Sequence, residues 1–200
     1  MTDLIAQAQK TPKALTDEEL ANVFVRLMEY PTDEGLTHSD LVDTLVNRAA
    51  SGSYEILRAL SLYYSNLNGD LFYVGVDMDY ERKYLRALEY IGNALKVRDK
   101  SYDDRLIRYG EYEDSYLERD LAFALRSLFG RAEDIQESLE YDLGKEHKLS
   151  AESVEYSNIS MKAEELSSPL DVLHHLQPHH EKYTSFVVNY IATCESNDCR

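Results

Sequence analysis

Apolar side chains recur every three to four residues through most of this chain, and that spacing predicts amphipathic α-helices. The clearest case follows Thr16 and Glu19, which form a capping box at the start of a helix. The apolar stripe of this helix contains Leu20, Val23, Phe24, Leu27 and Met28. Pro31 and Gly35 are expected to end it, because proline and glycine both disfavour helix continuation.

The same spacing predicts helices along the rest of the chain. Thr37 and Asp40 repeat the cap signature before a second helix over residues 41–46. Later ranges with helical spacing are 53–67, 79–97, 111–129 and 131–143, followed by a helix that starts at Pro169 and a last one from about Pro178. Short connections between these segments predict an all-α fold, an irregular multi-helix bundle of about eight helices.

Some segments depart from the helical pattern. Residues 71–76 (LFYVGV) are rich in β-branched and aromatic side chains, so at most one short isolated strand is expected there. Residues 1–15 form a polar lead-in and residues 195–200 a polar tail. Residues 145–167 are acidic and weakly periodic, and we expect loop, one short helix and mobility in this segment. The sequence thus predicts a single helical domain over residues 16–194.

Charge narrows the class of partner. The chain has 37 acidic and 21 basic side chains, a formal net charge of −16, and the halves that meet at residue 100 carry −5 and −11. Direct binding to nucleic acid or to an anionic membrane surface needs a basic patch, so neither is expected. An acidic surface attracts a basic partner instead.

Other features indicate the compartment. No run approaches the roughly 18 apolar residues that a membrane span needs, and the start MTDLIAQAQKTPK lacks the order of a signal peptide. Cysteine occurs only at positions 194 and 199, which excludes a disulfide framework for the fold. These features predict a cytoplasmic protein.

The candidate partner-binding site lies in the stretch from Ser101 to Asp120, where tyrosines and carboxylates crowd together. Three tyrosines are spaced three and four residues apart and could line one face of a helix, and three carboxylates flank them. These residues are Tyr109, Glu111, Tyr112, Asp114, Tyr116 and Glu118. Arginine pairs with carboxylates and stacks on phenol rings, so this face suits an arginine- and lysine-rich groove. Tyrosines at helical spacing are also common at the edge of a core.

A second candidate is a metal site near the carboxyl terminus. Imidazoles and carboxylates, the usual ligands of zinc, iron and manganese, occur close together here. The residues are Asp171, His174, His175, His179 and His180. Pro178 interrupts the helix between the two histidine pairs, which predicts that the rings splay apart across a kink. A polar corner between helices is the alternative interpretation, and Cys194 and Cys199 are weak further ligands.

No catalytic motif emerges, so we expect no enzymatic activity and no cofactor. Carboxylate ladders such as Glu133, Glu137 and Glu140 lie on surface-like helix faces, where nothing raises a pKa for acid–base work. The leading hypothesis is an acidic interaction protein that binds a basic protein surface. Its sharpest form is an inhibitor that mimics nucleic-acid charge, as phage-encoded inhibitors do. The alternatives are a metal-binding protein or metal-dependent hydrolase, and a structural subunit of a larger assembly.

Overall fold

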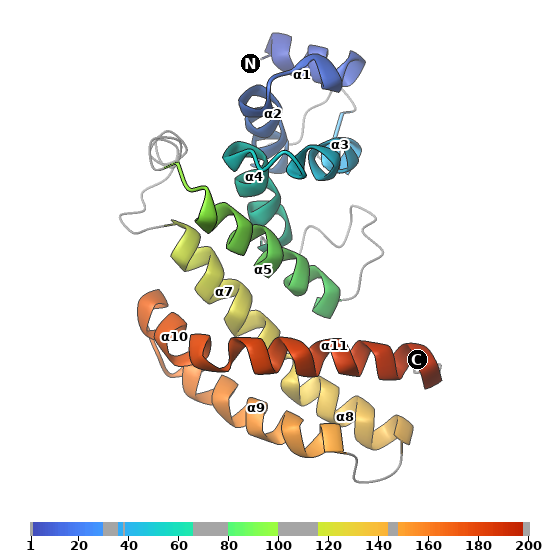
Figure 1. Ribbon diagram of the computed structural model, residues 1–200, viewed down its shortest axis with the longest axis vertical. Coiled ribbons are helices and arrows are strands. Elements are labelled where there is room, and N and C mark those ends of the chain that lie inside the picture. Colours follow the sequence, from blue (N-terminus) through green and yellow to red (C-terminus); the bar gives the residue numbers. More distant parts are fainter. Residues whose placement is uncertain are drawn as a thin grey trace. The chain divides into compact units, whose positions relative to one another are not determined.

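The computed structural model describes residues 2–29, 36–37, 39–65, 80–99, 116–143 and 148–197. Within these ranges the chain forms ten α-helices, two short 3-10 helices and no strand, which confirms the all-α class (Figure 1). The strand predicted at 71–76 lies outside the described residues. The chain groups into two compact units, Met1–Asp77 with Arg86–Tyr116 and Met78–Leu85 with Leu117–Arg200. One domain over 16–194 stays a prediction.

The first unit is built around α4 (Tyr54–Ser65), which is buried on almost every side. It packs against α2 (Asp17–Glu29) and α3 (Ser39–Ala49). Helix α1 (Thr2–Lys10) packs against the short helix η1 (Pro12–Ala14) and against α2. The first unit also includes the part of α5 (Tyr80–Lys96) that follows Leu85. The predicted polar lead-in is therefore helical, because Ile5, Ala8 and Leu15 give it an apolar side that is buried.

Aromatic rings occupy much of the interior of the first unit. Phe24 on α2 meets Tyr63 edge-on with ring centroids 5.5 Å apart, and Tyr63 meets Tyr64 at 4.9 Å. Tyr64 stacks on Tyr90 of α5 at 5.5 Å. Burial raises the pKa of Tyr63 to about 12. These tyrosines supply apolar area to a core in which the phenols stay protonated at neutral pH.

Arg48 of α3 joins several parts of the first unit. Its Nη1 donates to the carbonyl oxygen of Leu15 and to Oδ1 of Asp17, both at 2.8 Å. Its Nη2 donates to the carbonyl oxygens of Pro12 at 3.3 Å and Lys13 at 3.0 Å. One planar guanidinium thus holds η1 and the start of α2 against α3, a geometry that lysine cannot reproduce.

Both capping predictions are confirmed. Thr16 donates from its backbone N–H and its Oγ1 to Oε2 of Glu19, each at 2.8 Å, and the Glu19 amide donates back to Thr16 Oγ1 at 3.3 Å. Thr37 makes the corresponding pair of 2.8 Å bonds to Oδ2 of Asp40. These bonds satisfy backbone donors that have no partner inside a helix.

The Thr16 cap leads to a stability prediction. Thr16→Ala removes the acceptor of the Glu19 amide and should lower the free energy of unfolding by about 1 kcal/mol. Urea denaturation of the two proteins at pH 7 measures the difference. A change below about 0.5 kcal/mol, the size of a neutral surface substitution, would show that the cap does not stabilise α2.

The same cap should depend on pH. The hydrogen bonds from the Thr16 backbone and side chain lower the pKa of Glu19 below its ordinary value. A carboxyl with a depressed pKa contributes stability above its unfolded-state value and loses it as pH falls through the folded-state value. The difference between the wild-type protein and Thr16→Ala should therefore shrink in acid.

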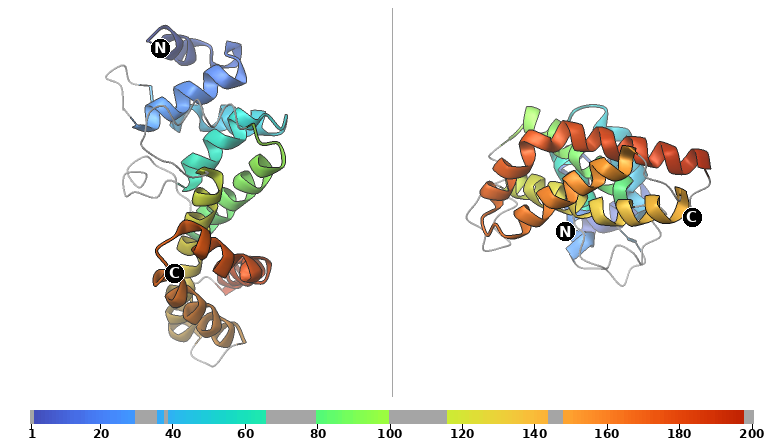
Figure 2. Two further views of the ribbon diagram at one scale, coloured as in Figure 1. Left: turned by 90° about the vertical axis from the view of Figure 1, so that its left-hand side faces the viewer. Right: turned by 90° about the horizontal axis from the view of Figure 1, so that it is seen from below.

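The second unit contains the first residues of α5 and the helices from α7 onward. These are α7 (Tyr116–Gly130), α8 (Ala132–Leu143), α9 (Lys148–Glu164), α10 (Pro169–Leu176), η4 (Gln177–His179) and α11 (His180–Asn197). Helices α8 and α9 run side by side in opposite directions (Figures 1 and 2), and α9 also packs against α10 and α11. Pro169 at the first position of α10 and the break at Pro178 agree with the predicted helix starts.

A second aromatic cluster forms the interior of this unit. Tyr183 stacks on Phe129 with ring centroids 4.1 Å apart and meets Tyr156 edge-on at 4.6 Å. Phe186 lies 5.6 Å from Tyr183. The Tyr183 hydroxyl donates to the backbone carbonyl of Leu128 at 2.7 Å, near the end of α7. The cluster therefore links α7, α9 and α11 through both ring packing and one buried hydrogen bond.

Helix α9 replaces the loop and short helix expected within residues 145–167. The helix spans Lys148–Glu164, and its buried positions do follow a helical spacing. These positions are Leu149, Ser153, Tyr156, Ser157, Ser160 and Ala163. Half of them are serines, so the apolar pattern was too weak to predict the helix. Each serine is small, and Ser157 Oγ donates to Oε1 of Glu133 on α8 at 2.9 Å, which satisfies a buried hydroxyl.

Candidate functional site

The six predicted partner-binding residues are described only in part. Tyr109, Glu111, Tyr112 and Asp114 lie outside the described residues. Tyr116 is the first residue of α7, and Glu118 follows in the first turn. The Glu118 side chain is half-buried and its Oε2 atom is shielded from solvent. Glu118 therefore presents less of its carboxylate to a partner than the sequence suggested, while the grouping of the six remains a prediction.

The tyrosine enrichment upstream of this segment belongs to the core. The tyrosines concerned are Tyr63, Tyr64, Tyr84 and Tyr90. All four are buried, with exposed fractions between 2% and 7%. Their abundance is explained by packing inside the first unit and, for Tyr84, the second unit, and no support for a tyrosine-bearing surface comes from them.

The expected separation of the histidine rings across Pro178 is seen only in part, because Gln177 keeps helical backbone angles and the rings of His175 and His179 remain neighbours. His174 and Asp171 are exposed on α10, whereas His175 Nε2 donates to the carbonyl oxygen of Ile159 on α9 at 3.0 Å. The rings of His175 and His179 lie 6.3 Å apart at a steep angle. Burial lowers the pKa of His180, so its ring stays uncharged near neutral pH.

The described side chains of this group do not surround a common point. Within the described residues, no three histidine, cysteine, aspartate or glutamate side chains are placed to hold one ion. Cys194 is half-buried on α11, and Cys199 lies outside the described residues. His175 has a structural role, because its hydrogen bond to the Ile159 carbonyl oxygen joins α10 to α9. The metal-binding hypothesis remains a prediction that elemental analysis of purified protein can test.

Helix α8 carries a group of exposed carboxylates. Glu133, Asp134 and Glu137 are all exposed, and the first and last of these belong to the ladder seen in the sequence. Glu133 accepts the bond from Ser157, and Asp134 pairs with Arg131. The helix contains no basic residue, so its outer side presents negative charge.

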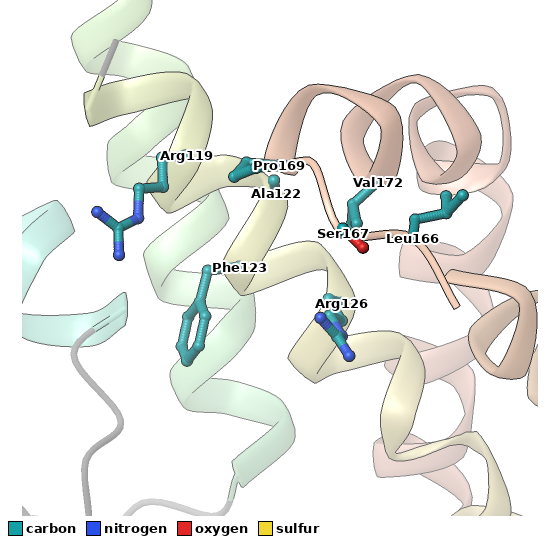
Figure 3. A pocket seen from close by; sticks show the side chains of 8 residues that line it. All are labelled: Arg119, Ala122, Phe123, Arg126, Leu166, Ser167, Pro169 and Val172. Carbon is teal, nitrogen blue, oxygen red and sulfur yellow. The ribbon is translucent and has the colours of Figure 1, made fainter. Parts of the chain in front are cut away.

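The second unit contains a small pocket that the sequence did not predict (Figure 3). Its volume is about 110 Å³. From α7 come Arg119, Ala122, Phe123 and Arg126, and the facing wall is formed by Leu166, Ser167, Pro169 and Val172. The sequence did contain one indication of this pocket: Arg119, Phe123 and Arg126 are spaced four and three residues apart, which places all three on one helix face. The sequence alone does not distinguish an exposed phenylalanine from a buried one.

Comparison of the chain with protein-family models, curated proteins and solved structures gives no match. No helix within the described residues is long and apolar enough to cross a membrane. The function must therefore be inferred from the charges and geometry of this chain.

Proposed function

We propose that this chain is a non-enzymatic helical interaction protein that binds a basic surface of another protein. The observation that supports the proposal is its charge of −16, of which residues 101–200 carry −11. On α8, acidic side chains stand on the outside of a helix that has no basic residue. Such a surface steers a positively charged partner toward it and raises the association rate.

The partner-binding face consists of Tyr109, Glu111, Tyr112, Asp114, Tyr116 and Glu118. Three carboxylates there provide acceptors for arginine and lysine, and three phenols provide stacking area. In its sharpest form the proposal makes the chain an inhibitor that occupies a nucleic-acid-binding site and substitutes carboxylates for phosphates. The exposed carboxylates of α8 add to the negative charge of residues 101–200, but they are not proposed to contact the partner.

The test begins with capture of partners from a native lysate and their identification by mass spectrometry. The captured protein should be basic, and its complex should weaken as ionic strength rises, because salt screens exposed charge pairs. If the inhibitor form is right, excess duplex DNA or RNA should displace the chain from its partner. A complex that is unaffected by salt would contradict the electrostatic proposal.

Charge reversal then locates the contact. The triple variant Glu111→Lys, Asp114→Lys and Glu118→Lys should weaken binding by at least about tenfold, since each reversal turns an attraction into a repulsion. Surface plasmon resonance with the purified partner measures the change, and circular dichroism confirms that helicity is kept.

A matched control variant distinguishes the effect of reversing charges on this face from the effect of changing the net charge. Glu137→Lys, Glu164→Lys and Glu181→Lys change the formal charge by the same amount, but these exposed residues lie on three different helices. The control should bind within about threefold of wild type, allowing for the weaker long-range field. Equal losses in both triple variants would overturn the assignment of the six-residue face.

A further inference from the structure

Exposed apolar side chains of α9 border the acidic side of α8, along which α9 runs (Figures 1 and 2). Ser157 of α9 donates to Glu133 of α8 at 2.9 Å, so the face of α9 around Ser157 is turned toward α8. Val154 and Met161 lie three residues before and four residues after Ser157, and residues at these separations share a helix face. Their side chains are 43% and 49% exposed. This face of α9 therefore presents apolar area to solvent beside α8.

Carboxylates line the α8 side of the same surface. Glu137 follows Glu133 by about one turn, so both lie on the α8 face that is turned toward α9, and both are exposed. The bond from Ser157 uses Oε1 of Glu133 and leaves Oε2 for a partner. On α9, Glu164 is exposed and follows Met161 by three residues. We call this set the α8–α9 edge, which consists of Glu133, Glu137, Val154, Met161 and Glu164.

The balance of charge on these two helices is negative. Together α8 and α9 contain eight acidic residues and two basic ones, Lys148 and Lys162. Lys148 is the first residue of α9. Lys162 is about 140° around the helix from Ser157, which places it on the side of α9 away from α8. Arg131, just before α8, is paired with Asp134. The α8–α9 edge therefore attracts a cationic partner.

The spacing along α9 fits a helical partner. Val154 and Met161 are seven residues apart, which is about 10 Å along the helix axis. An amphipathic helix that lies along this edge presents apolar residues at the same separation, from its positions i and i+7. Lysine and arginine on its flanks can reach the carboxylates, because their long side chains extend past an apolar stripe. An extended segment would need a free sheet edge, and the part of the chain that the structure describes contains no strand.

We propose that the α8–α9 edge binds a basic amphipathic helix of a partner protein. The apolar residues of that helix cover Val154 and Met161, and its lysine and arginine residues pair with Glu133, Glu137 and Glu164. The α8–α9 edge shares no residue with the six-residue face proposed above. The helix is therefore a separate ligand, and either contact can fail without the other.

The experiment is an NMR titration of the full chain with the synthetic helix Ala-Lys-Lys-Leu-Ala-Lys-Ala-Leu-Lys-Lys-Leu-Ala-Lys-Ala, whose leucines share one face. Shifts should be concentrated in α8 and α9, with a dissociation constant on the order of 0.1 mM at low salt, because exposed ion pairs and a small apolar contact each contribute little. A peptide of the same composition with its leucines spread around the helix should bind at least about fivefold more weakly. Equal binding of the reordered peptide, or shifts that map to other helices, would overturn the proposal.

Apolar variants of the protein test the contact with the leucines. Val154→Ala combined with Met161→Ala should weaken the peptide at least about fivefold, because both exposed apolar side chains are truncated. The matched control is Leu170→Ala combined with Val188→Ala, at 50% and 49% exposure on α10 and α11. The control should change the affinity less than about twofold, and equal losses in the two double variants would refute the assignment.

Charge variants test the contact with the lysines. Glu137→Gln combined with Glu164→Gln should weaken the peptide at least about threefold, since two facing carboxylates are lost. Asp171→Asn combined with Glu181→Gln removes the same charge from exposed positions on α10 and α11, and should change the affinity less than about twofold. Equal effects of the two pairs would show that the peptide responds to net charge alone, which contradicts the proposal.

Two further outcomes would assign the surfaces differently. A peptide that loses affinity in the triple charge-reversal variant described above, but not in the variants of the α8–α9 edge, would bind the six-residue face. That result would overturn this inference and support the proposed function. A protein that sediments as a dimer without peptide, and as a monomer in Val154→Ala with Met161→Ala, would show that a second copy of the chain occupies the edge.

Discussion

Replacing Tyr183 with alanine should lower the free energy of unfolding of the second unit by about 3–5 kcal/mol. Tyr183 is fully buried between Phe129, Tyr156 and Phe186, so its loss empties the middle of the aromatic cluster. A loss of this size is a large share of the stability of a small domain. Urea denaturation followed by far-UV circular dichroism measures it, and a cost below about 1.5 kcal/mol would contradict the central place of Tyr183 in the core.

Two conservative variants separate the ring from its hydroxyl. Tyr183→Phe removes only the donor to the Leu128 carbonyl, which also accepts a 3.1 Å bond from the Arg131 amide, so a cost of about 1 kcal/mol is expected. Tyr156→Phe is the matched control from the same cluster. Its hydroxyl is buried with no partner at good hydrogen-bond geometry, and the exposed Lys182 ammonium interacts with it, so its removal should cost less than about 0.5 kcal/mol. Equal costs for the two variants would contradict this distinction.

Arg48→Ala should lower the free energy of unfolding of the first unit by about 2–3 kcal/mol. The guanidinium donates to three backbone carbonyls and to Asp17, and it lies partly buried, with 21% of its side chain exposed. Truncation leaves those acceptors without their charged donor. Arg48→Lys should recover less than half of the loss, because one ammonium group cannot span acceptors arranged around a planar fork.

Arg86→Ala is the control for Arg48. Arg86 pairs with Glu89 one turn away at 2.8 Å, and both side chains are about half exposed. Exposed pairs of this kind contribute about 0.5 kcal/mol or less. Hydrogen exchange of the α2 and α3 amides should accelerate in Arg48→Ala and stay unchanged in Arg86→Ala, and similar exchange in both would refute the joining role of Arg48.

Helix ends and apolar stripes were predictable because their causes are local. The cap at Thr16 and Glu19 and the proline start of α10 depend on residues within one turn, so their identity is enough. Helix α9 was missed because Ser153, Ser157 and Ser160 occupy its buried side. A serine is buried only where a neighbouring helix is close and a partner such as Glu133 is present, and neither condition is visible in one segment.

For the candidate sites too, the features set by neighbouring residues are the ones that the sequence can address, and the features set by packing are not. Pro178 introduces a short 3-10 turn, but the expected splaying of the rings was wrong for His175 and His179, whose centroids lie 6.3 Å apart because the backbone stays helical at Gln177. The sequence could not assign the buried Tyr90 to the core, because exposure depends on what packs against a helix. The pocket beside Phe123 was invisible for the same reason, as half of its wall comes from residues 166–172.

By itself the sequence determined the all-α class, the caps and the negative charge of this protein, since these follow from residue identity and spacing along the chain. Only the tertiary structure decided that Tyr90 belongs to the core, that Arg48 joins η1, α2 and α3, and that Phe123 stands exposed between two arginines. The physical reason is that burial and long-range hydrogen bonds depend on segments far apart in sequence, such as Tyr183 and Leu128.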